Sequence, residues 1–211
     1  MICYLIGAGD APLDPPRPGA GDLVIAADAG LTLARELGLT PSLTVGDFDS
    51  LGCVPEGGDV MRLPVEKDDT DMAAALRIGR ERGYRTFYLF GGTGGRPDHT
   101  YANYQLLADC AGRKETAILF GQGYRAVAIA DGARLTFPKT ARGTLSVFSV
   151  LGEAKGVSER GVYYPLTGAT LSGTVPLGVS NHFLPGVSAE ISVGQGTLLV
   201  FFEGNILPCV S

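Results

Sequence analysis

The chain has 211 residues, of which 45% are hydrophobic and 18% are charged. This apolar content suffices for a packed core and excludes a disordered chain. The formal net charge of −5 argues against a broad surface for nucleic acids or anionic membranes, so neither is expected as a partner. Glycine (31 residues) and proline (13 residues) are frequent without a collagen-like period, which indicates many tight turns.

Cysteine usage points to a reducing compartment. The four cysteines are far apart and form no C-x-x-C pair, and the chain has only two histidines, which argues against a structural zinc site. Reduced, mostly buried thiols are the simpler expectation. The first residues lack the basic region of a signal peptide, and no apolar stretch has the length of a membrane span. We therefore expect a cytoplasmic protein.

The first half alternates between short apolar runs and helical segments. The expected strands are 2–6, 23–27, 43–45, 60–65, 86–90 and 116–120, and the expected helices are 30–37, 71–82 and 98–111. Thr70 can cap the second helix, and Pro64 places the fourth strand near an edge. Strands that alternate with helices at this spacing predict a three-layer α/β domain with a parallel sheet.

The second half has a different pattern. Short β-branched or aromatic runs are separated by turn residues, and no amphipathic helix is expected between them. They span residues 125–130, 134–138, 144–150, 189–194 and 197–204. This pattern predicts an all-β domain, an antiparallel β-sandwich or barrel, of which we prefer the sandwich. The change falls between residues 121 and 132, which divides the chain into domains 1–124 and 125–211.

Aspartate is distributed unevenly between the two halves. Eight of the 13 aspartates lie between residues 28 and 98, and none follows Asp131. Most of these eight lie where an expected strand meets a helix, at the edge of a parallel sheet where ligands bind. The segments concerned are A-D-A-G (27–30), G-D-F-D-S (46–50), K-D-D-T-D (67–71) and G-G-T-G-G-R-P-D-H (91–99).

The chemistry of these segments suits a nucleotide phosphate. If the chain is still extended at Asp47 and Asp49, both carboxylates share one side and repel each other unless a cation lies between them. Crowded hard oxygen ligands suit Mg²⁺, and helix starts offer N–H groups to phosphates. Residues 91–95 let the backbone approach a ligand, and Arg96 has the planar fork that matches phosphate. The set predicts Mg²⁺-assisted transfer from a nucleotide phosphate.

Each segment also has a structural interpretation. Asp28 could cap the next helix, and Asp47 and Asp49 could be turn formers. Asp68, Asp69 and Asp71 could form an acidic helix N-terminus. The glycine segment matches neither the phosphate-loop pattern nor the dinucleotide pattern, which excludes those two interpretations.

These four motifs in this order resemble the thiamine pyrophosphokinase (thiamine diphosphokinase) family of the bacterial type. The second half adds Y-Y-P-L (163–166) and S-N (180–181) in the expected order. The resemblance implies a catalytic nucleotide-binding α/β domain, a β-sandwich that helps to bind thiamine, and a homodimer with the thiamine pocket at the subunit interface. The implied reaction moves the β,γ-diphosphate of ATP to the hydroxyethyl oxygen of thiamine and releases AMP.

The resemblance also implies roles for individual residues. Asp47, Asp49 and Asp71 would hold Mg²⁺ and the triphosphate, and Asp98 would complete the catalytic set. The residues expected around ATP are Asp28, Ser50, Lys67, Asp68, Thr70, Gly92, Arg96 and His99, and those expected at thiamine are Tyr164, Ser180 and Asn181.

The sequence departs from the family pattern at two positions. Pro97 replaces a residue that is commonly leucine, which alters the segment before Asp98. The family often has S-N-E where this chain has His182 after Asn181, so an acidic contact to cationic thiamine is missing. The chain has no tryptophan, so stacking on the pyrimidine ring would need another aromatic residue.

Other functions remain open at this point. A related enzyme could pass the diphosphate to another alcohol, such as a hydroxymethylpterin, or a metal-dependent hydrolase could pass it to water. A non-catalytic nucleotide or thiamine sensor would bind without releasing AMP. The number of carboxylates argues against the sensor, because one or two would be enough to bind Mg²⁺.

Overall fold

The structure is a computed structural model that describes residues 1–48, 59–64 and 69–211. The chain divides into two compact units. The α/β unit comprises Met1–Asn103 and Ile118–Gln122, and the β unit comprises Tyr104–Ala117 and Gly123–Ser211. None of the helices in the described part of the chain has the length and apolar character that crossing a bilayer requires.

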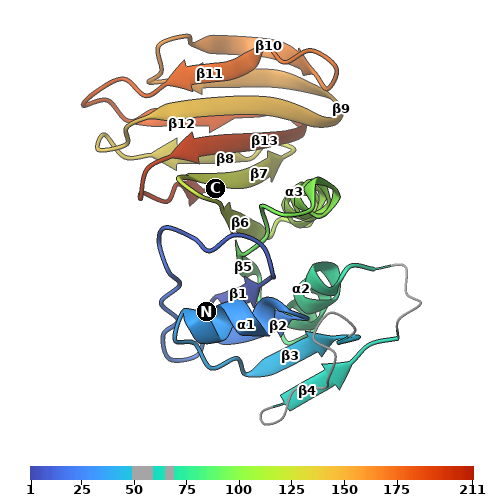
Figure 1. The fold of residues 1–211 in the computed structure, drawn as a ribbon. Coiled ribbons are helices and arrows are strands. Elements are labelled where there is room, and N and C mark those ends of the chain that lie inside the picture. The colour runs from blue at the N-terminus through green and yellow to red at the C-terminus, as the bar shows by residue number, and fades with distance from the viewer. Residues whose placement is uncertain (49–58, 65–68) are drawn as a thin grey trace. The chain divides into compact units, whose positions relative to one another are not determined.

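The chain begins with alternating strands and helices and continues with strands alone (Figure 1). The first elements are β1 (Cys3–Ile6), β2 (Leu23–Ala27), α1 (Gly30–Glu36), β3 (Leu43–Gly46), β4 (Asp59–Arg62), α2 (Asp71–Glu81), β5 (Thr86–Phe90), α3 (Pro97–Gly112) and β6 (Thr116–Phe120). The later strands are β7 (Tyr124–Ala130), β8 (Arg134–Phe137), β9 (Thr144–Arg160), β10 (Leu166–Ser172), β11 (Gly178–His182), β12 (Ala189–Ser192), β13 (Gln195–Glu203) and β14 (Cys209–Val210).

The strands of the α/β unit lie in the order β6-β5-β1-β2-β3-β4. The pairs from β5 to β4 are all parallel, with β1 paired to both β2 and β5. The inner strands β1, β2 and β3 are buried along their whole length, as expected for a sheet that is covered on both faces. Strand β4 pairs with β3 at the edge, as the sequence predicts, but it ends at Arg62, before Pro64, and not at residue 65.

Alternate residues of β1 and β5 face opposite sides of this sheet. On one side, Gly79 of α2 packs against Cys3 and Phe87. On the other side, the ring centroids of Tyr4 and Tyr88 lie 5.7 Å apart, and the Tyr4 hydroxyl donates a hydrogen bond to the carbonyl of Arg17. Helix α2 therefore covers one face, and the chain between β1 and β2 contributes to covering the other.

The β unit is antiparallel, and its strands lie in the order β7-β13-β9-β12-β8-β14. The long strand β9 joins its two halves. Residues 145–150 pair with β13, and residues 153–160 pair mainly with β10 and β12. The turn between them occurs at Leu151 and Gly152, whose φ angles are 64° and 111°. A strand that bends in this way can contribute to both layers of a sandwich.

The predicted fold class is confirmed: a parallel α/β part is followed by antiparallel strands. Strands β2, β5 and β6 match the predicted ranges, and the boundaries of the three helices differ by one residue at most. The run at 144–150 is only the first part of β9, and β10, β11 and β14 were not predicted. The division at residue 124 stays a prediction.

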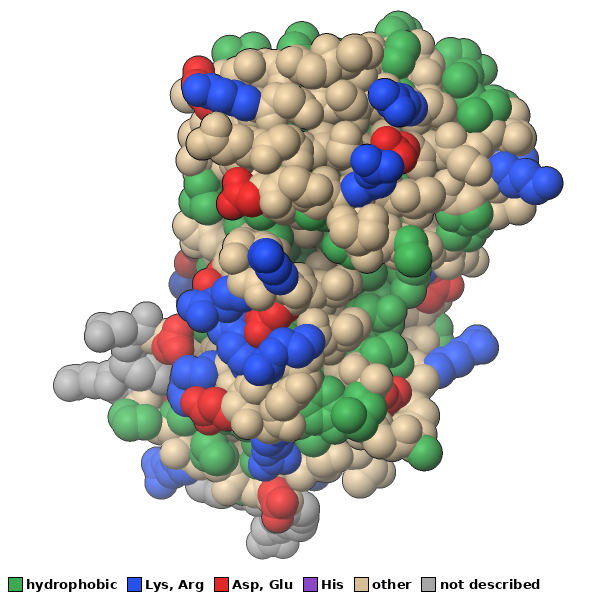
Figure 2. Space-filling view, turned by 180° about the vertical axis from the view of Figure 1, so that it is seen from behind, with side chains coloured by type: hydrophobic (Ala, Val, Ile, Leu, Met, Phe, Trp, Pro, Cys, Tyr) green, Lys and Arg blue, Asp and Glu red, His purple; other side chains and the backbone are tan. Residues whose placement is uncertain are grey.

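The surface agrees with the weak net charge. On the face that Figure 2 shows, basic and acidic side chains are interspersed. Within helices, exposed ion pairs join Arg77 to Glu81 in α2 and Arg113 to Asp109 in α3. Exposed pairs of this kind add little stability, typically less than about 1 kcal/mol each.

Candidate active site

A cavity of about 490 Å³ lies in the α/β unit, at the carboxyl ends of β1, β2, β3 and β5. Parallel topology predicts a ligand site at this edge, because the loops that follow adjacent strands converge there. The cavity is lined by Gly7, Ala8, Gly9, Ala27, Asp28, Ala29, Asp47, Thr70, Asp71, Met72, Gly91, Gly92, Gly94, Gly95, Arg96, His99 and Asn103.

Two glycine segments pack closely at one wall of this cavity. Hydrogen bonds of 2.8 Å join the Gly7 amide to the Phe90 carbonyl and the Gly9 amide to the Gly91 carbonyl, so the pairing of β1 with β5 continues beyond both strands. A Cβ atom on Gly7 would lie 2.6 Å from the Gly91 oxygen, a distance that real side chains do not tolerate. Glycine is required here because two backbones pass in contact.

Asp28 lies at the floor of the cavity. It is 9% exposed, and its φ of 47° lies in the left-handed region that aspartate tolerates better than most residues. Its Oδ1 atom is buried and has no hydrogen-bond partner among the described residues. Helix α1 is capped by Ala29 without a side-chain hydrogen bond, so the capping interpretation of Asp28 is wrong.

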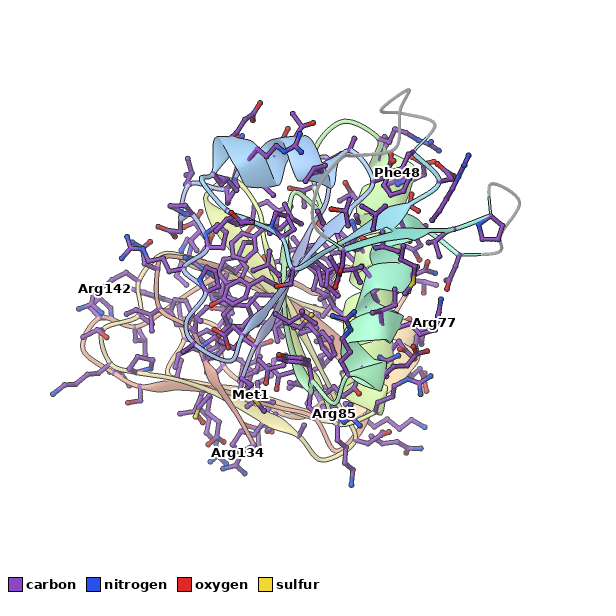
Figure 3. All side chains as sticks on the ribbon, turned by 90° about the horizontal axis from the view of Figure 1, so that it is seen from below. Met1, Phe48, Arg77, Arg85, Arg134 and Arg142 are labelled. Atoms are coloured by element: carbon purple, nitrogen blue, oxygen red, sulfur yellow. The ribbon has the colours of Figure 1, made fainter. Side chains whose placement is uncertain are left out.

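The G-D-F-D-S motif begins at the last residue of strand β3. Strand β3 ends at Gly46, and Phe48, which lies beyond its end in Figure 3, is 3% exposed with φ at 63°. The condition that the chain is still extended here is not met at Phe48, because its left-handed backbone breaks the alternation of side chains. Asp47 nevertheless lines the cavity. Gly46 leaves room for Asp28, whose Cβ would lie 3.0 Å from an added methyl group.

The start of α2 forms another wall. Thr70 is the N-cap, and its hydroxyl accepts a 3.1 Å hydrogen bond from the amide of Ala73. This cap fixes where the helix begins, so that Asp71 is its first residue and lines the cavity. The positive end of the helix dipole stabilises the carboxylate of Asp71 and would equally attract a phosphate.

Arg96 and Asp98 lie at the start of α3 and bind each other. The Arg96 Nε atom donates to Asp98 Oδ1 at 3.2 Å, and an Nη atom donates to Oδ2. This hydrogen bond holds the pKa of the Asp98 carboxyl below its ordinary value. Both side chains are largely exposed, at 72% and 61%, and Arg96 lines the cavity whereas Asp98 does not.

Sequence reasoning missed two contributors to the cavity. The segment Gly7-Ala8-Gly9 lines the cavity, and its place directly after a predicted strand could have indicated a ligand-binding role. Asn103 is 6% exposed and donates a 2.7 Å hydrogen bond to the Gly92 carbonyl, which helps to hold the glycine segment. It follows His99 by four residues on α3, so both lie on one helix face.

Part of the predicted site lies outside the described residues, namely Asp49, Ser50, Lys67 and Asp68. Within the described ranges, no three His, Cys, Asp or Glu side chains are grouped so that they could hold a metal ion. The two cavity carboxylates Asp47 and Asp71, together with the unpaired oxygen of Asp28, are hard donors of the kind Mg²⁺ prefers. Mg²⁺ commonly uses only one or two protein carboxylates and completes its shell with phosphate and water.

The residues predicted at thiamine lie in the β unit. Tyr164 is 71% exposed, and Ser180 is exposed with φ at 60°, at a register shift where β11 pairs with β9. Asn181, by contrast, is 5% exposed. Its Oδ1 accepts from the amide of Tyr164 at 3.0 Å, and its Nδ2 donates to the carbonyl of Tyr164 and to the carboxyl of Glu159.

The exposed rings of this region come from two segments. Tyr163 is 57% exposed, and its ring contacts that of His182 edge-on at a centroid distance of 6.2 Å. Its amide donates to the His182 carbonyl, which ties the segment before β10 to β11. His182 is therefore an exposed aromatic neighbour of Tyr163 at the position where the family often has an acid.

The models of two domains of one family match separate segments of the chain. Residues 20–120 match "Thiamin pyrophosphokinase, catalytic domain", and residues 133–198 match "Thiamin pyrophosphokinase, vitamin B1 binding domain". The first segment contains the described carboxylates that line the cavity. The second contains Glu159, Tyr164, Ser180 and Asn181.

Individual relatives agree with this result. The chain is 32% identical to a thiamine pyrophosphokinase of Bacillus subtilis over 112 residues, which span 49% of this chain and about half (52%) of that relative. A crystal structure of thiamine pyrophosphokinase from Bacillus subtilis has a TM-score of 0.83 at 22% identity and covers 97% of this chain and 100% of its own. One from Geobacillus thermodenitrificans has a TM-score of 0.81 at 27% identity and covers 97% and 98%.

The similarity in fold extends to a eukaryotic structure. Yeast thiamin pyrophosphokinase has a TM-score of 0.75 at 15% identity, covering 98% of this chain and 86% of its own. Consecutive segments of the chain thus match a catalytic domain and a vitamin B1 binding domain of one family, and solved structures of that family align with 97% of the chain. The chain belongs to the thiamin pyrophosphokinase family.

Proposed function

We propose that this protein transfers the β,γ-diphosphate of ATP to the hydroxyethyl oxygen of thiamine and releases AMP. The observation that carries the proposal is the cavity at the carboxyl ends of the parallel strands, with Asp28, Asp47, Asp71 and Arg96 in its wall. Apart from Gly7, Ala8 and Gly9, the residues that line this cavity lie in the segment that matches the family's catalytic domain, and the following segment matches its vitamin B1 binding domain.

The nucleotide would bind through backbone and charge. The segment 91–95 and the starts of α2 and α3 present N–H groups and positive dipole ends to the triphosphate. Arg96 would exchange the carboxylate of Asp98 for phosphate oxygens, which match its fork equally well. The assigned nucleotide residues that line the cavity are Asp28, Thr70, Gly92, Arg96 and His99, and Ser50, Lys67 and Asp68 are assigned from the resemblance alone.

Asp47, Asp49 and Asp71 are the residues that would hold Mg²⁺, which, when bound, neutralises phosphate charge and stabilises the charge of the transition state. The protein's own contribution is then to hold the reacting oxygens in line and keep water away from them. A carboxylate is also needed to accept the proton of the thiamine alcohol, and the candidates are Asp71 and Asp98. Asp71 lines the cavity and Asp98 does not, so the geometry favours Asp71.

Thiamine would bind to the β unit. Its positive charge suits the exposed rings of Tyr163 and Tyr164, because aromatic faces attract cations. Ser180 offers an exposed hydroxyl beside them, whereas Asn181 is buried and would act through the Tyr164 backbone that it binds. We further propose that the protein is a cytoplasmic homodimer with the thiamine pocket at the subunit interface. Light scattering of the purified protein would test whether it is a dimer.

The reaction can be tested by measuring AMP and thiamine diphosphate together. ATP, Mg²⁺ and thiamine should give both products in equal amounts, and a chelator should abolish both. AMP in the absence of thiamine would identify a hydrolase, and binding without AMP would identify a sensor. A panel of other alcohols, including a hydroxymethylpterin, would reveal a different acceptor. Glu153→Gln, which removes an exposed carboxyl from β9, is a control variant that should behave like the wild type.

A further inference from the structure

Glu159 is a buried carboxyl that the proposed reaction leaves without a role. It is 1% exposed, and its neighbours across the sheet are Leu166 of β10 and Ile191 of β12. Burying a carboxyl is costly unless it is hydrogen-bonded or protonated. Its partner is Asn181, whose Nδ2 donates to Glu159 Oε2 at 3.0 Å within the buried interior.

The charged groups around Glu159 face elsewhere. Arg160 and Glu190 are paired across β9 and β12, one position along from Glu159, so they point to the opposite side of the sheet. His182 follows Asn181 on β11 and is exposed. Burial raises the pKa of the Glu159 carboxyl to about 7, so a large fraction of the protein molecules carries a proton on Glu159 at neutral pH. The protonated, neutral carboxyl can stay buried without a cationic partner.

The hydrogen bond from Asn181 connects Glu159 to the exposed tyrosines. The same Asn181 amide group donates to the Tyr164 carbonyl at 2.9 Å and accepts from the Tyr164 amide at 3.0 Å. These two bonds fix the backbone of Tyr164 from both sides. If the acceptor on Glu159 were lost, one Nδ2 proton would be buried unsatisfied, and the amide group would gain by rotating away from Tyr164.

We propose that Glu159 is a positioning residue for the thiamine-binding segment, because it orients the Asn181 side chain that holds Tyr164. The proposal rests on the proposed function for the identity of the bound molecule, but the hydrogen-bond relay itself does not. Glu159 touches neither substrate. Its effect is confined to the geometry of the segment around Tyr163 and Tyr164.

The test compares Glu159→Met, which is of similar length but has no acceptor, with Glu159→Gln, which keeps a carbonyl oxygen for Asn181. The Met variant should raise the apparent KM for thiamine about tenfold, with the KM for ATP and kcat nearly unchanged. The Gln variant should retain the wild-type KM for thiamine. The control Glu153→Gln alters an exposed carboxyl of the same strand.

A double-mutant cycle separates positioning from general damage. If Glu159 acts through Asn181, the variant with both Glu159→Met and Asn181→Ala should bind thiamine no worse than Asn181→Ala alone. Additive effects would overturn the proposal. A raised thiamine KM in Glu159→Gln would overturn it as well, because it would mean that charge and not the hydrogen bond matters. If the Met variant does not fold, the thiamine KM of Glu159→Gln alone tests the proposal, and a raised value overturns it.

Amide hydrogen exchange provides a measurement that does not depend on activity. The Tyr164 amide should exchange faster in Glu159→Met than in the wild type, and at the wild-type rate in Glu159→Gln. Unchanged exchange in the Met variant overturns the proposal even if thiamine diphosphate is formed. Faster exchange in a protein that forms no thiamine diphosphate supports the relay and rejects the proposed function.

Discussion

Asp28 combines two unfavourable features that a folded chain rarely retains together. Its backbone is in the left-handed region, and its buried Oδ1 has no hydrogen-bond partner among the described residues. Such features cost stability and persist mainly at ligand sites, where the bound molecule supplies the missing interaction. The position of Asp28 in the wall of the cavity agrees with this explanation.

We therefore predict that Asp28→Asn stabilises the unliganded protein by about 1 kcal/mol and lowers the rate of AMP formation. An amide is easier to bury than a carboxylate, and asparagine tolerates the left-handed region. Urea unfolding and the AMP assay measure the two effects. Asp22→Asn is the matched control, since the Asp22 carboxylate accepts hydrogen bonds from the amides of Ile2 and Gly19 and its loss should destabilise. A destabilised Asp28→Asn would contradict the explanation.

Asp71 and Asp98 are carboxylates at the starts of two different helices, and their roles can be separated by mutation. Asp71→Asn should lower kcat by roughly 10² or more, because Asp71 lines the cavity and is a proposed ligand of the Mg²⁺ that stabilises the charge of the transition state. Asp98→Asn should have a smaller effect, since Asp98 lies outside the cavity lining and contacts Arg96. Steady-state kinetics with saturating thiamine would measure both. A larger loss in Asp98→Asn would make Asp98 the proton acceptor in place of Asp71.

Among the elements, α2 depends on close packing that its sequence does not reveal. An added Cβ on Gly79 would lie 2.8 Å from the Cys3 sulfur and 3.1 Å from the Phe87 ring. Gly79→Ala should therefore destabilise the protein by about 1–3 kcal/mol, although alanine favours a helix over glycine by about 1 kcal/mol. Gly112→Ala at the end of α3 is the control, because nothing lies within 4 Å of its added methyl group.

Thermal unfolding of the two variants would measure this difference. Gly112→Ala should be neutral or slightly stabilising, since only the helix preference changes. If Gly79→Ala were equally stable, α2 would have to be able to move away from the sheet. The same shift would displace Asp71 at the start of this helix.

Strand β9 illustrates how a strand of the β unit can continue beyond the end that its sequence pattern indicates. The pattern at 144–150 alternates between buried and half-buried residues, and the pair Leu151-Gly152 looks like the end of a strand. In the structure this pair is a corner with positive φ, and the chain continues as a strand to Arg160. Pairing with β10, with β12 and with Gln195 of β13 keeps the second half extended, and β12 and β13 are distant from it in sequence.

At the scale of the whole molecule, the candidate site was predictable to the extent that it depends on topology. Asp28, Asp47 and Asp71 follow or precede predicted elements, and a parallel sheet brings such positions to one edge. The contribution of Gly7 was missed because its contact with Gly91 pairs residues far apart in sequence. The inward orientation of Asn181 was missed because it depends on the irregular register at Ser180.

The pH dependence of folding should reveal the buried carboxyl of Glu159. Its pKa rises from an ordinary 4.5 to about 7 in the folded protein, so the folded state holds a proton that the unfolded state releases. This contribution to stability is complete below pH 4.5 and is lost as the pH rises through about 7. The loss amounts to about 3 kcal/mol, since each pKa unit corresponds to about 1.4 kcal/mol.

Glu159→Gln removes this titration, so the wild type should lose stability relative to the variant by about 3 kcal/mol between pH 4 and pH 8. The carboxyls of Asp22 and Glu203, whose pKa values are lowered by backbone hydrogen bonds, lose stability as the pH falls, but they occur in both proteins and cancel in the difference. Urea unfolding of the wild type and of Glu159→Gln across this pH range would measure the difference in their stability. A constant difference would mean that Glu159 is hydrated in solution and is not buried against Asn181.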